Sequence, residues 1–203
     1  MTRTAVLVSG NGVLLQTILD SMYFGEIPDF ELVGVICPVE NEFVRRRCKN
    51  AGKDLIVVEP ADFPTEEYYN QAICNKLKDM DIDLVVLADY AMPLGCIAEN
   101  YKNRIIGVYP SLIPAFETEA DPLAAALERG CKLTGASSYF ADSRGGVGAI
   151  IGQQALAINP EDSLEELRHR MTQEAEWSLL SKAVILFCEN RLEIKNGKVI
   201  IKE

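Results

Sequence analysis

Two patterns of hydrophobic and polar residues alternate along the first 110 residues of the chain. Short, β-branched-rich apolar runs predict five buried strands, at residues 4–10, 31–37, 54–59, 83–89 and 104–110. The segments between them predict helices at residues 13–24, 41–52 and 65–80. Continuous apolar strands are typical of parallel sheets that are covered on both faces. The order therefore predicts an α/β fold with a Rossmann-like, mostly parallel twisted sheet and helices on both faces.

The pattern changes after residue 130, where strands follow one another without a helix. Residues 134–142 and 149–158 are separated by a short glycine-rich segment, and this spacing predicts an antiparallel extension of the sheet. Near the C-terminus, Asn196 and Gly197 stand between two short alternating runs. Asn-Gly in that setting predicts a C-terminal β-hairpin.

Residues 162–190 have the apolar spacing of one long helix. Its start at Asp162 and Ser163 is typical of a capped N-terminus. The expected core stripe of this helix consists of Leu164, Leu167, Met171, Ala175, Leu179 and Ala183. No linker, repeat or low-complexity segment interrupts the chain, so residues 1–203 are expected to form a single domain.

Composition narrows the class of protein. Hydrophobic residues make up 48% and charged residues 25%, the balance of a globular protein with an ample core. The apolar runs are too short to span a bilayer, and the N-terminus lacks a signal-peptide cleavage site. A net charge of -10 and the lack of a basic patch oppose nucleic-acid binding. We expect no membrane or nucleic-acid partner.

The residues most used in metal and acid–base chemistry are sparse. Six cysteines are scattered without a Cys-x-x-Cys spacing, which predicts reduced thiols in a cytoplasmic protein and no metal site. His169 is the only histidine, and its position on the flank of the helical stripe predicts a surface residue.

The first strand leads to a glycine-containing turn at residues 8–16. Gly10 and Gly12 allow close backbone approach, and the following helix start can hold an anion. The dinucleotide fingerprint fails because Leu15 stands at its third glycine, and the phosphate-binding Walker A motif is absent too. Anion binding and a plain tight turn are equally compatible with this sequence.

Five segments, in order along nearly the whole chain, resemble motifs of the phosphoribosylglycinamide formyltransferase family. S-G-N-G-V-L-L-Q (9–16) is similar to the family's S-G-N-G-S-N-L-Q phosphate loop, and G-V-Y-P-S-L-I-P (107–114) to its central N-[IV]-H-P-S-L-L-P motif. The other three segments are residues 85–94, 139–158 and 171–180. The resemblance implies the formyltransferase fold and folate-dependent formyl transfer in purine biosynthesis.

The resemblance also implies binding positions, which carry over one by one. The substrate phosphate would meet the first turn at Asn11, Gly12, Val13 and Leu14. The central motif would contribute Pro110, and the ribose of the substrate would meet Glu174. The formyl-tetrahydrofolate cosubstrate would meet Tyr90, Met92, Leu94, Ala141 and Asp142. Val13 and Leu14 replace the polar donors of the family loop. Formyl-tetrahydrofolate is implied by the resemblance alone, and the residues themselves indicate no cofactor.

The family's catalytic residues are substituted at all three positions. Gly107 stands at the asparagine, Tyr109 at the histidine and Gly146 at the aspartate that orients the histidine. A tyrosine with the usual pKa of about 10 is a poor base at neutral pH. Tyr109 and Asp142 are the candidate replacements.

Three functions remain open. The chain is expected to be a binding or regulatory protein with a degenerate active site and a small-molecule ligand in its cleft. The alternatives are an active acyl transferase with shifted catalytic residues, aided by the acidic loop at residues 117–121, and a protein whose fold serves assembly. We expect a monomer or homodimer, with the turn at residues 10–12 and the loop at residues 110–121 at one sheet edge.

Overall fold

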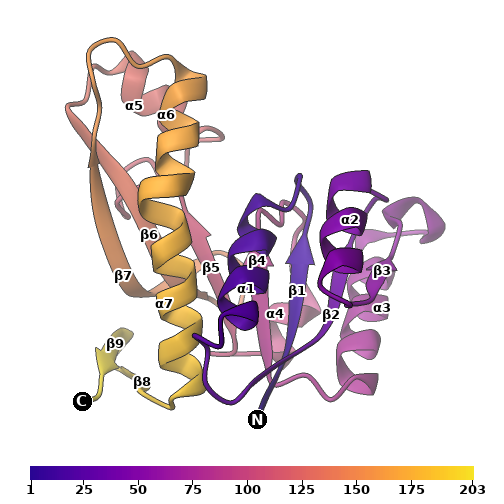
Figure 1. Cartoon of the computed structure of the whole chain (residues 1–203). Helices are drawn as coiled ribbons and strands as arrows, with labels where there is room; N and C mark the ends of the chain where they lie inside the picture. The colour runs from indigo at the N-terminus through magenta and orange to yellow at the C-terminus, as the bar shows by residue number, and fades with distance from the viewer.

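The computed structural model describes residues 1–203 and contains nine strands (Figure 1). They are β1 (Thr2–Val8), β2 (Phe30–Cys37), β3 (Leu55–Val57), β4 (Leu84–Ala88), β5 (Ile105–Tyr109), β6 (Leu133–Ala141), β7 (Val147–Ala157), β8 (Leu192–Lys195) and β9 (Lys198–Ile201). The helices are α1 (Val13–Tyr23), α2 (Glu42–Asn50), α3 (Glu66–Asp79), α4 (Cys96–Asn100), α5 (Pro122–Glu128), α6 (Leu164–Met171) and α7 (Trp177–Cys188). A 3₁₀ turn, η1 (Pro60–Asp62), and a π-helical turn, η2 (Thr172–Glu176), complete the set.

Seven strands form one sheet in the order β3-β2-β1-β4-β5-β6-β7. The first five in this order pair in parallel, and β6 and β7 extend the sheet antiparallel to β5 and to each other. The predicted Rossmann-like sheet, its antiparallel extension and the separate β8-β9 hairpin are therefore confirmed. Asn196 and Gly197 both have positive φ, as the tight hairpin turn requires.

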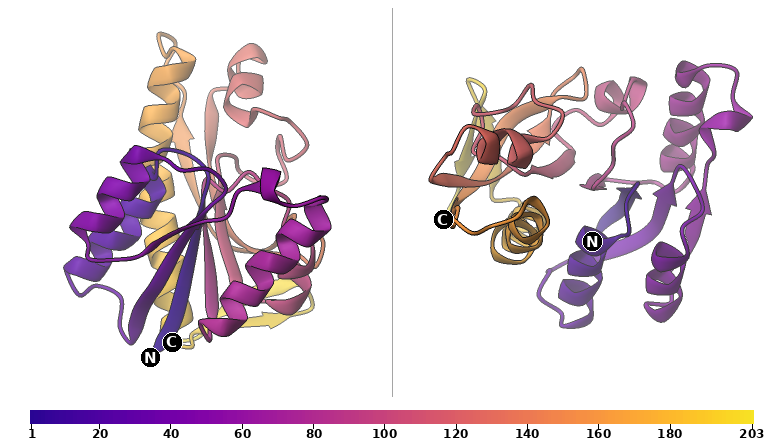
Figure 2. Two further views of the ribbon diagram at one scale, coloured as in Figure 1. Left: turned by 90° about the vertical axis from the view of Figure 1, so that its right-hand side faces the viewer. Right: turned by 90° about the horizontal axis from the view of Figure 1, so that it is seen from above.

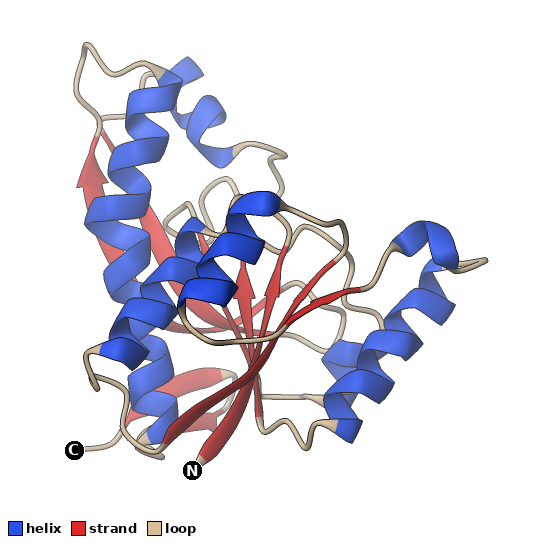
Figure 3. Cartoon of the chain, turned by 45° about the vertical axis from the view of Figure 1, so that its right-hand side comes forward, coloured by secondary structure: helices blue, strands red, loops and turns tan.

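Helices cover both faces of the sheet (Figures 2 and 3). Alternate residues of β1 explain why: Val6 and Val8 pack in a core with α1, α2 and α7, whereas Ala5 and Leu7 pack in a second core with α3 and α4. Strand side chains alternate between the two faces, so a continuous apolar run serves two cores at once. A third, smaller cluster joins α5 and α6 to β6 and β7 beyond the parallel part of the sheet.

The predicted long helix consists of α6, η2 and α7 in direct succession. Ser163 caps it, and the side chain of Glu166 completes a capping box. Its core stripe repeats every four residues, which drifts by about 40° per step in a regular α-helix. The wider π turn offsets part of this drift, and the stripe from Leu167 to Ala183 stays buried.

Three short elements were not predicted: η1, α4 and α5. They span three to seven residues, too few for a hydrophobic period to appear. The start of α5 carried a readable signal, because Asp121 caps the helix by accepting from the N–H of Ala124 and Pro122 follows at the first helical position.

Candidate active site

A cavity of about 620 Å³ opens at the carboxyl ends of β4 and β5. Its lining comes from the ends of both strands, from the segment before α5, from β6 and from α6. A recess of about 180 Å³ adjoins it and shares Asp89, Pro110 and Arg168 with it. The N–H of Ala91 donates to the Ser9 hydroxyl at 3.1 Å, which brings the turn after β1 to the same edge. Because β1, β4 and β5 run parallel, the turn at residues 10–12 and the loop at residues 110–121 lie at the same edge of the sheet, as predicted.

Gly107 in β5 lies directly opposite Tyr139 in β6. A Cβ atom on Gly107 would lie 2.9 Å from both Cζ and the hydroxyl oxygen of Tyr139, closer than van der Waals contact allows. Burial, together with the nearby Tyr109 phenol, raises the pKa of Tyr139 to about 12. The Tyr139 ring thus occupies the space that a side chain at position 107 would need.

Tyr109 lines the cavity, and its hydroxyl forms a hydrogen bond with the neighbouring loop. The hydroxyl lies 3.2–3.3 Å from the carbonyl oxygens of Phe116, Glu117 and Glu119, and its single proton is donated to one of the three at a time. Burial raises the pKa of Tyr109, and the charges of Glu117 and Glu119 raise it further. This phenol is therefore a loop anchor, and a smaller fraction of it is ionised at neutral pH than of an ordinary tyrosine.

Gly146 and Asp142 belong to the turn between β6 and β7. The Asp142 carboxylate accepts from the backbone N–H groups of Arg144 at 2.8 Å and Gly146 at 2.9 Å. Partial burial alone would raise the pKa of Asp142, but these donors and the Arg144 guanidinium outweigh it and hold the pKa below its usual range. Asp142 closes its own turn and does not line the cavity.

The turn after β1 is tight and has few side-chain hydrogen-bond donors. Gly12 has φ 72° and precedes α1 without a side-chain cap, and Leu14 is buried in the core. Asn11 is exposed, and Val13 is the half-buried first residue of the helix. The guanidinium of Arg47 donates to the carbonyl of Asn11 at 3.3 Å, so a positive charge lies over the turn.

The positions expected to meet a folate are only partly accessible. Tyr90 lines the cavity, and its hydroxyl lies 3.1 Å from that of Tyr69. Met92 packs against the core, and Leu94 and Ala141 are buried in it. The structure therefore brings Tyr90, Tyr109 and Pro110 together in the cavity, and the other predicted contact residues do not line it.

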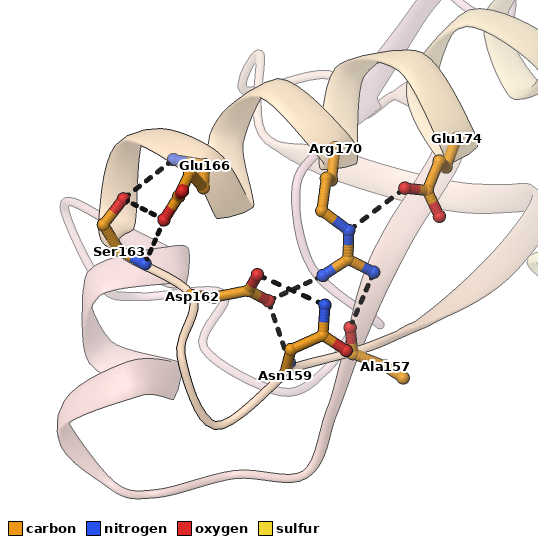
Figure 4. Close-up of polar contacts among 7 residues, drawn as sticks. All are labelled: Ala157, Asn159, Asp162, Ser163, Glu166, Arg170 and Glu174. Carbon is orange, nitrogen blue, oxygen red and sulfur yellow. Dashed lines mark hydrogen bonds and ion pairs between the residues drawn. The ribbon is translucent and has the colours of Figure 1, made fainter.

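Glu174 takes part in a polar network with Arg170, Asp162 and Asn159 (Figure 4). Its carboxylate accepts from Nε of Arg170 at 3.1 Å, and Arg170 also pairs with Asp162. Asn159 completes this network beyond the end of β7. Glu174 does not line the cavity, and its predicted contact with a ribose stays a prediction.

Two carboxyl groups line the recess: Asp89 belongs to the segment 85–94 that the resemblance places at the pocket, whereas Glu176 was not predicted. Asp89 follows β4 at φ 55°, and the protein around its side chain raises its pKa by desolvation. Glu176, in the π turn, is 7% exposed and accepts from the Thr172 hydroxyl at 2.9 Å. Burial and the charge of Asp89 raise the pKa of Glu176 to about 7. A second glutamate near Glu174 gave no signal in the sequence, because the π turn decides which one is buried.

Two carboxylates of the acidic loop before α5 form ion pairs with arginines. Glu119 pairs with Arg129 at 3.0 Å, and Asp121 pairs with Arg168. His169 is exposed on α6 and does not line the cavity, so the cavity contains no imidazole. No group of three His, Cys, Asp or Glu side chains is close enough to hold a metal ion. None of the helices has the length and apolar character to cross a membrane.

Comparison with known proteins is consistent along the chain. The formyl transferase family model matches residues 2–184. Phosphoribosylglycinamide formyltransferase from Haemophilus influenzae is 31% identical over 201 residues, covering 97% of this chain and 92% of the relative. Glycinamide ribonucleotide transformylase 1 from Symbiobacterium toebii superposes with a TM-score of 0.94 at 35% identity, covering 100% of this chain and 95% of that one. A formyltetrahydrofolate deformylase from Pseudomonas syringae shares the fold, with a TM-score of 0.89 at 22% identity over 100% of this chain and 66% of that one.

Proposed function

Because this chain belongs to the formyl transferase family, we propose that it is a ligand-binding or regulatory member whose cleft no longer performs formyl transfer. The observation that carries the proposal is the Tyr139 ring against Gly107, which fills the place of the catalytic asparagine implied by the resemblance. A fold shared by transferases and a deformylase does not decide the reaction, so the site residues must.

Formyl transfer to an amine needs two groups in the right place. A hydrogen-bond donor must meet the oxyanion of the tetrahedral intermediate, and a base must take the proton of the attacking amine. Gly107 has no side-chain donor, and the single Tyr109 hydroxyl proton is directed at a group of three loop carbonyls. Asp142 is held ionised by its turn and is a weak base at neutral pH.

The loss of these groups is large on the scale of enzyme catalysis. Removal of one oxyanion donor costs about 10²–10³ in rate, and removal of a positioned acid–base group about 10²–10⁴. The effects do not multiply fully, because such residues act as a unit. Even the lower bounds of these two ranges place the rate of formyl transfer several orders of magnitude below that of an ordinary enzyme.

The cavity is also a poor match for formyl-tetrahydrofolate. Leu94 and Ala141 are buried below the surface that a pterin would have to contact. Asp89 and Glu176 line the recess beside the cavity, and ionised carboxylates there repel an anionic cosubstrate. Both observations support a change of ligand, and we derive no catalytic step through the folate.

One observation favours a second candidate, an acyl transferase with a relocated base. Glu176 has its pKa raised to about 7 by burial and Asp89, and it faces the recess beside the cavity. A carboxyl with a pKa near the working pH is suited to general-base catalysis. The candidate still lacks an oxyanion donor at position 107, which is why we rank it second.

A single-turnover assay separates the two candidates. The protein is held in excess over 10-formyl-tetrahydrofolate, glycinamide ribonucleotide is added, and the deformylated folate is followed by absorbance. We expect the wild type and Glu176→Gln to match the protein-free control. Product from the wild type that Glu176→Gln abolishes would establish the second candidate, and fast product from both would overturn the proposal.

A further inference from the structure

Two cysteines meet where α3 packs against α4. The Sγ atoms of Cys74 and Cys96 lie 3.5 Å apart, which is within hydrogen-bond distance for two thiols. The other four cysteines of the chain are also free, and none of them forms a sulfur–sulfur hydrogen bond. The sulfurs of a disulfide are about 2.05 Å apart, so a movement of about 1.5 Å, shared by two side chains, separates these thiols from a covalent bond.

The two helices approach closely at Gly95 and Asn70. Gly95 has φ 46°, and a Cβ atom on it would lie 2.6 Å from Nδ2 of Asn70. Glycine is the residue that allows this conformation and this close approach together. Cys96 follows Gly95 directly, and Cys74 lies one helical turn after Asn70. The packing that requires a glycine therefore also brings the two thiols into contact.

The two thiols differ in their access to solvent. Cys74 is fully buried, whereas Cys96 is partly exposed. Burial and the neighbouring Cys96 raise the pKa of the Cys74 thiol to about 12, so Cys74 keeps its proton. The amide Nδ2 of Asn100 donates to Sγ of Cys74 at 3.7 Å and favours negative charge on that sulfur. An oxidant from solvent therefore reaches Cys96 first, and Cys74 is the thiol placed to react with its product.

We propose that Cys74 and Cys96 form a reversible disulfide when the protein meets a hydroperoxide, and that this bond fixes one end of the segment that lines the cavity. The sulfur of Cys96 attacks a peroxide oxygen and the O–O bond breaks, so Cys96 becomes a sulfenic acid and the other oxygen leaves with the thiol proton as water or an alcohol. The sulfur of Cys74 then attacks that of Cys96, the S–O bond breaks, and the hydroxide leaves with the Cys74 proton as water. Two thiols are oxidised and one peroxide is reduced. A dithiol reverses the bond by exchange.

The bond acts on the segment between β4 and α4. Residues 89–91 of this segment line the cavity, and Cys96 is the first residue of α4. Helix α3 already contacts the first part of the segment, because the hydroxyls of Tyr69 and Tyr90 lie 3.1 Å apart. A disulfide to Cys74 attaches the other end to the same helix, so oxidation restricts the movement of the cavity wall between the two attachments. The inference goes beyond the proposed function and holds for any ligand of the cavity.

The test is mild oxidation of the full chain with hydrogen peroxide, followed by alkylation of the remaining thiols, tryptic digestion and mass spectrometry. Trypsin places Cys74 and Cys96 on separate peptides, residues 54–76 and 79–102, each with one cysteine. We expect one cross-linked species of these two peptides, two hydrogen atoms lighter than their sum, which dithiothreitol converts back to separate thiols. Cys96→Ser should abolish it. Cys131→Ser, a change at another partly exposed cysteine, is the matched control and should keep it.

Two further measurements show what the bond does. Hydrogen exchange at residues 89–96 should slow on oxidation of the wild type and of Cys131→Ser, and stay unchanged in Cys96→Ser. The urea midpoint of the wild type should rise on oxidation, because the bond joins positions 22 residues apart and restricts the unfolded chain. Cross-links spread over other cysteine pairs, or sulfinic and sulfonic acids at Cys96 without the cross-link, would overturn the inference. So would unchanged exchange at residues 89–96 in the fully cross-linked protein.

Discussion

The close contact between Gly107 and Tyr139 gives the sharpest prediction for stability. Gly107→Ala would place a methyl group 2.9 Å from Cζ and the hydroxyl of Tyr139. Overpacking of this kind costs about 1–3 kcal/mol, while replacing a strand glycine by alanine gains about 0.5–1 kcal/mol. We expect a net loss of about 1–2 kcal/mol, and each kcal/mol lowers the Tm by about 2–4 °C in a chain of this size.

A matched control lies in strand β2. A Cβ atom on Gly34 would meet Sδ of Met80 at 3.4 Å and Cδ1 of Ile56 at 3.5 Å, which are ordinary contacts. Gly34→Ala should therefore be neutral or stabilising. In a Tyr139→Leu background the clash disappears, and Gly107→Ala should then stabilise by about 0.5–1 kcal/mol.

Urea unfolding of the four proteins in this double-mutant cycle measures the coupling between positions 107 and 139. We expect a coupling of about 1–3 kcal/mol, with a change of sign between the two backgrounds. If Gly107→Ala behaves like Gly34→Ala with Tyr139 present, the ring does not occupy the space above β5. Tyr139 could then not be the reason why a side chain is excluded from position 107.

Three further changes test other parts of the structure. Glu176→Gln should flatten the pH dependence of unfolding, because the buried carboxyl holds its proton up to about pH 7. The free energy of unfolding of the wild type should fall by roughly 3 kcal/mol between pH 4.5 and 8, and that of the glutamine variant should not. The same change of urea midpoint with pH in both proteins would contradict this. Ser163→Ala removes the capping box and should cost about 1 kcal/mol by urea unfolding; no change would show that the cap is dispensable. Tyr109→Phe removes the one hydroxyl donor that three loop carbonyls surround, so we expect about 1 kcal/mol lower stability and faster proteolysis after residue 116, and unchanged proteolysis would refute its role as an anchor.

The sequence predicted the sheet well because its signals are local. The run at residues 83–89 is apolar throughout its centre, and β4 is buried on both faces. The Asn196-Gly197 pair predicted its hairpin because positive φ is readily adopted by those residues. In contrast, α5 is too short to show a period, and the π turn η2 has no composition that distinguishes it from the flanking helix.

The candidate site was predicted only where it follows from single positions. The family resemblance identified Gly107, Tyr109 and Gly146 as substitutions, but it did not indicate what fills the vacated space. That depends on the cross-strand register that places Tyr139 opposite Gly107, a contact between residues far apart in the sequence. Likewise, Glu174 and Glu176 are equivalent in the sequence, and only the packing of the π turn buries one and exposes the other.

The measurement that tests the central claim most directly is steady-state formyl transfer from 10-formyl-tetrahydrofolate to glycinamide ribonucleotide by the wild type. The reference is a variant carrying Gly107→Asn, Tyr109→His, Gly146→Asp and Tyr139→His, in which the last change makes room for the first. We predict that the wild type stays at the uncatalysed rate, and that any gain in activity is confined to the fourfold variant and absent from the variant that keeps Tyr139. Wild-type turnover approaching about 1 s⁻¹, within the ordinary range of enzymes, would contradict the loss of formyl transfer.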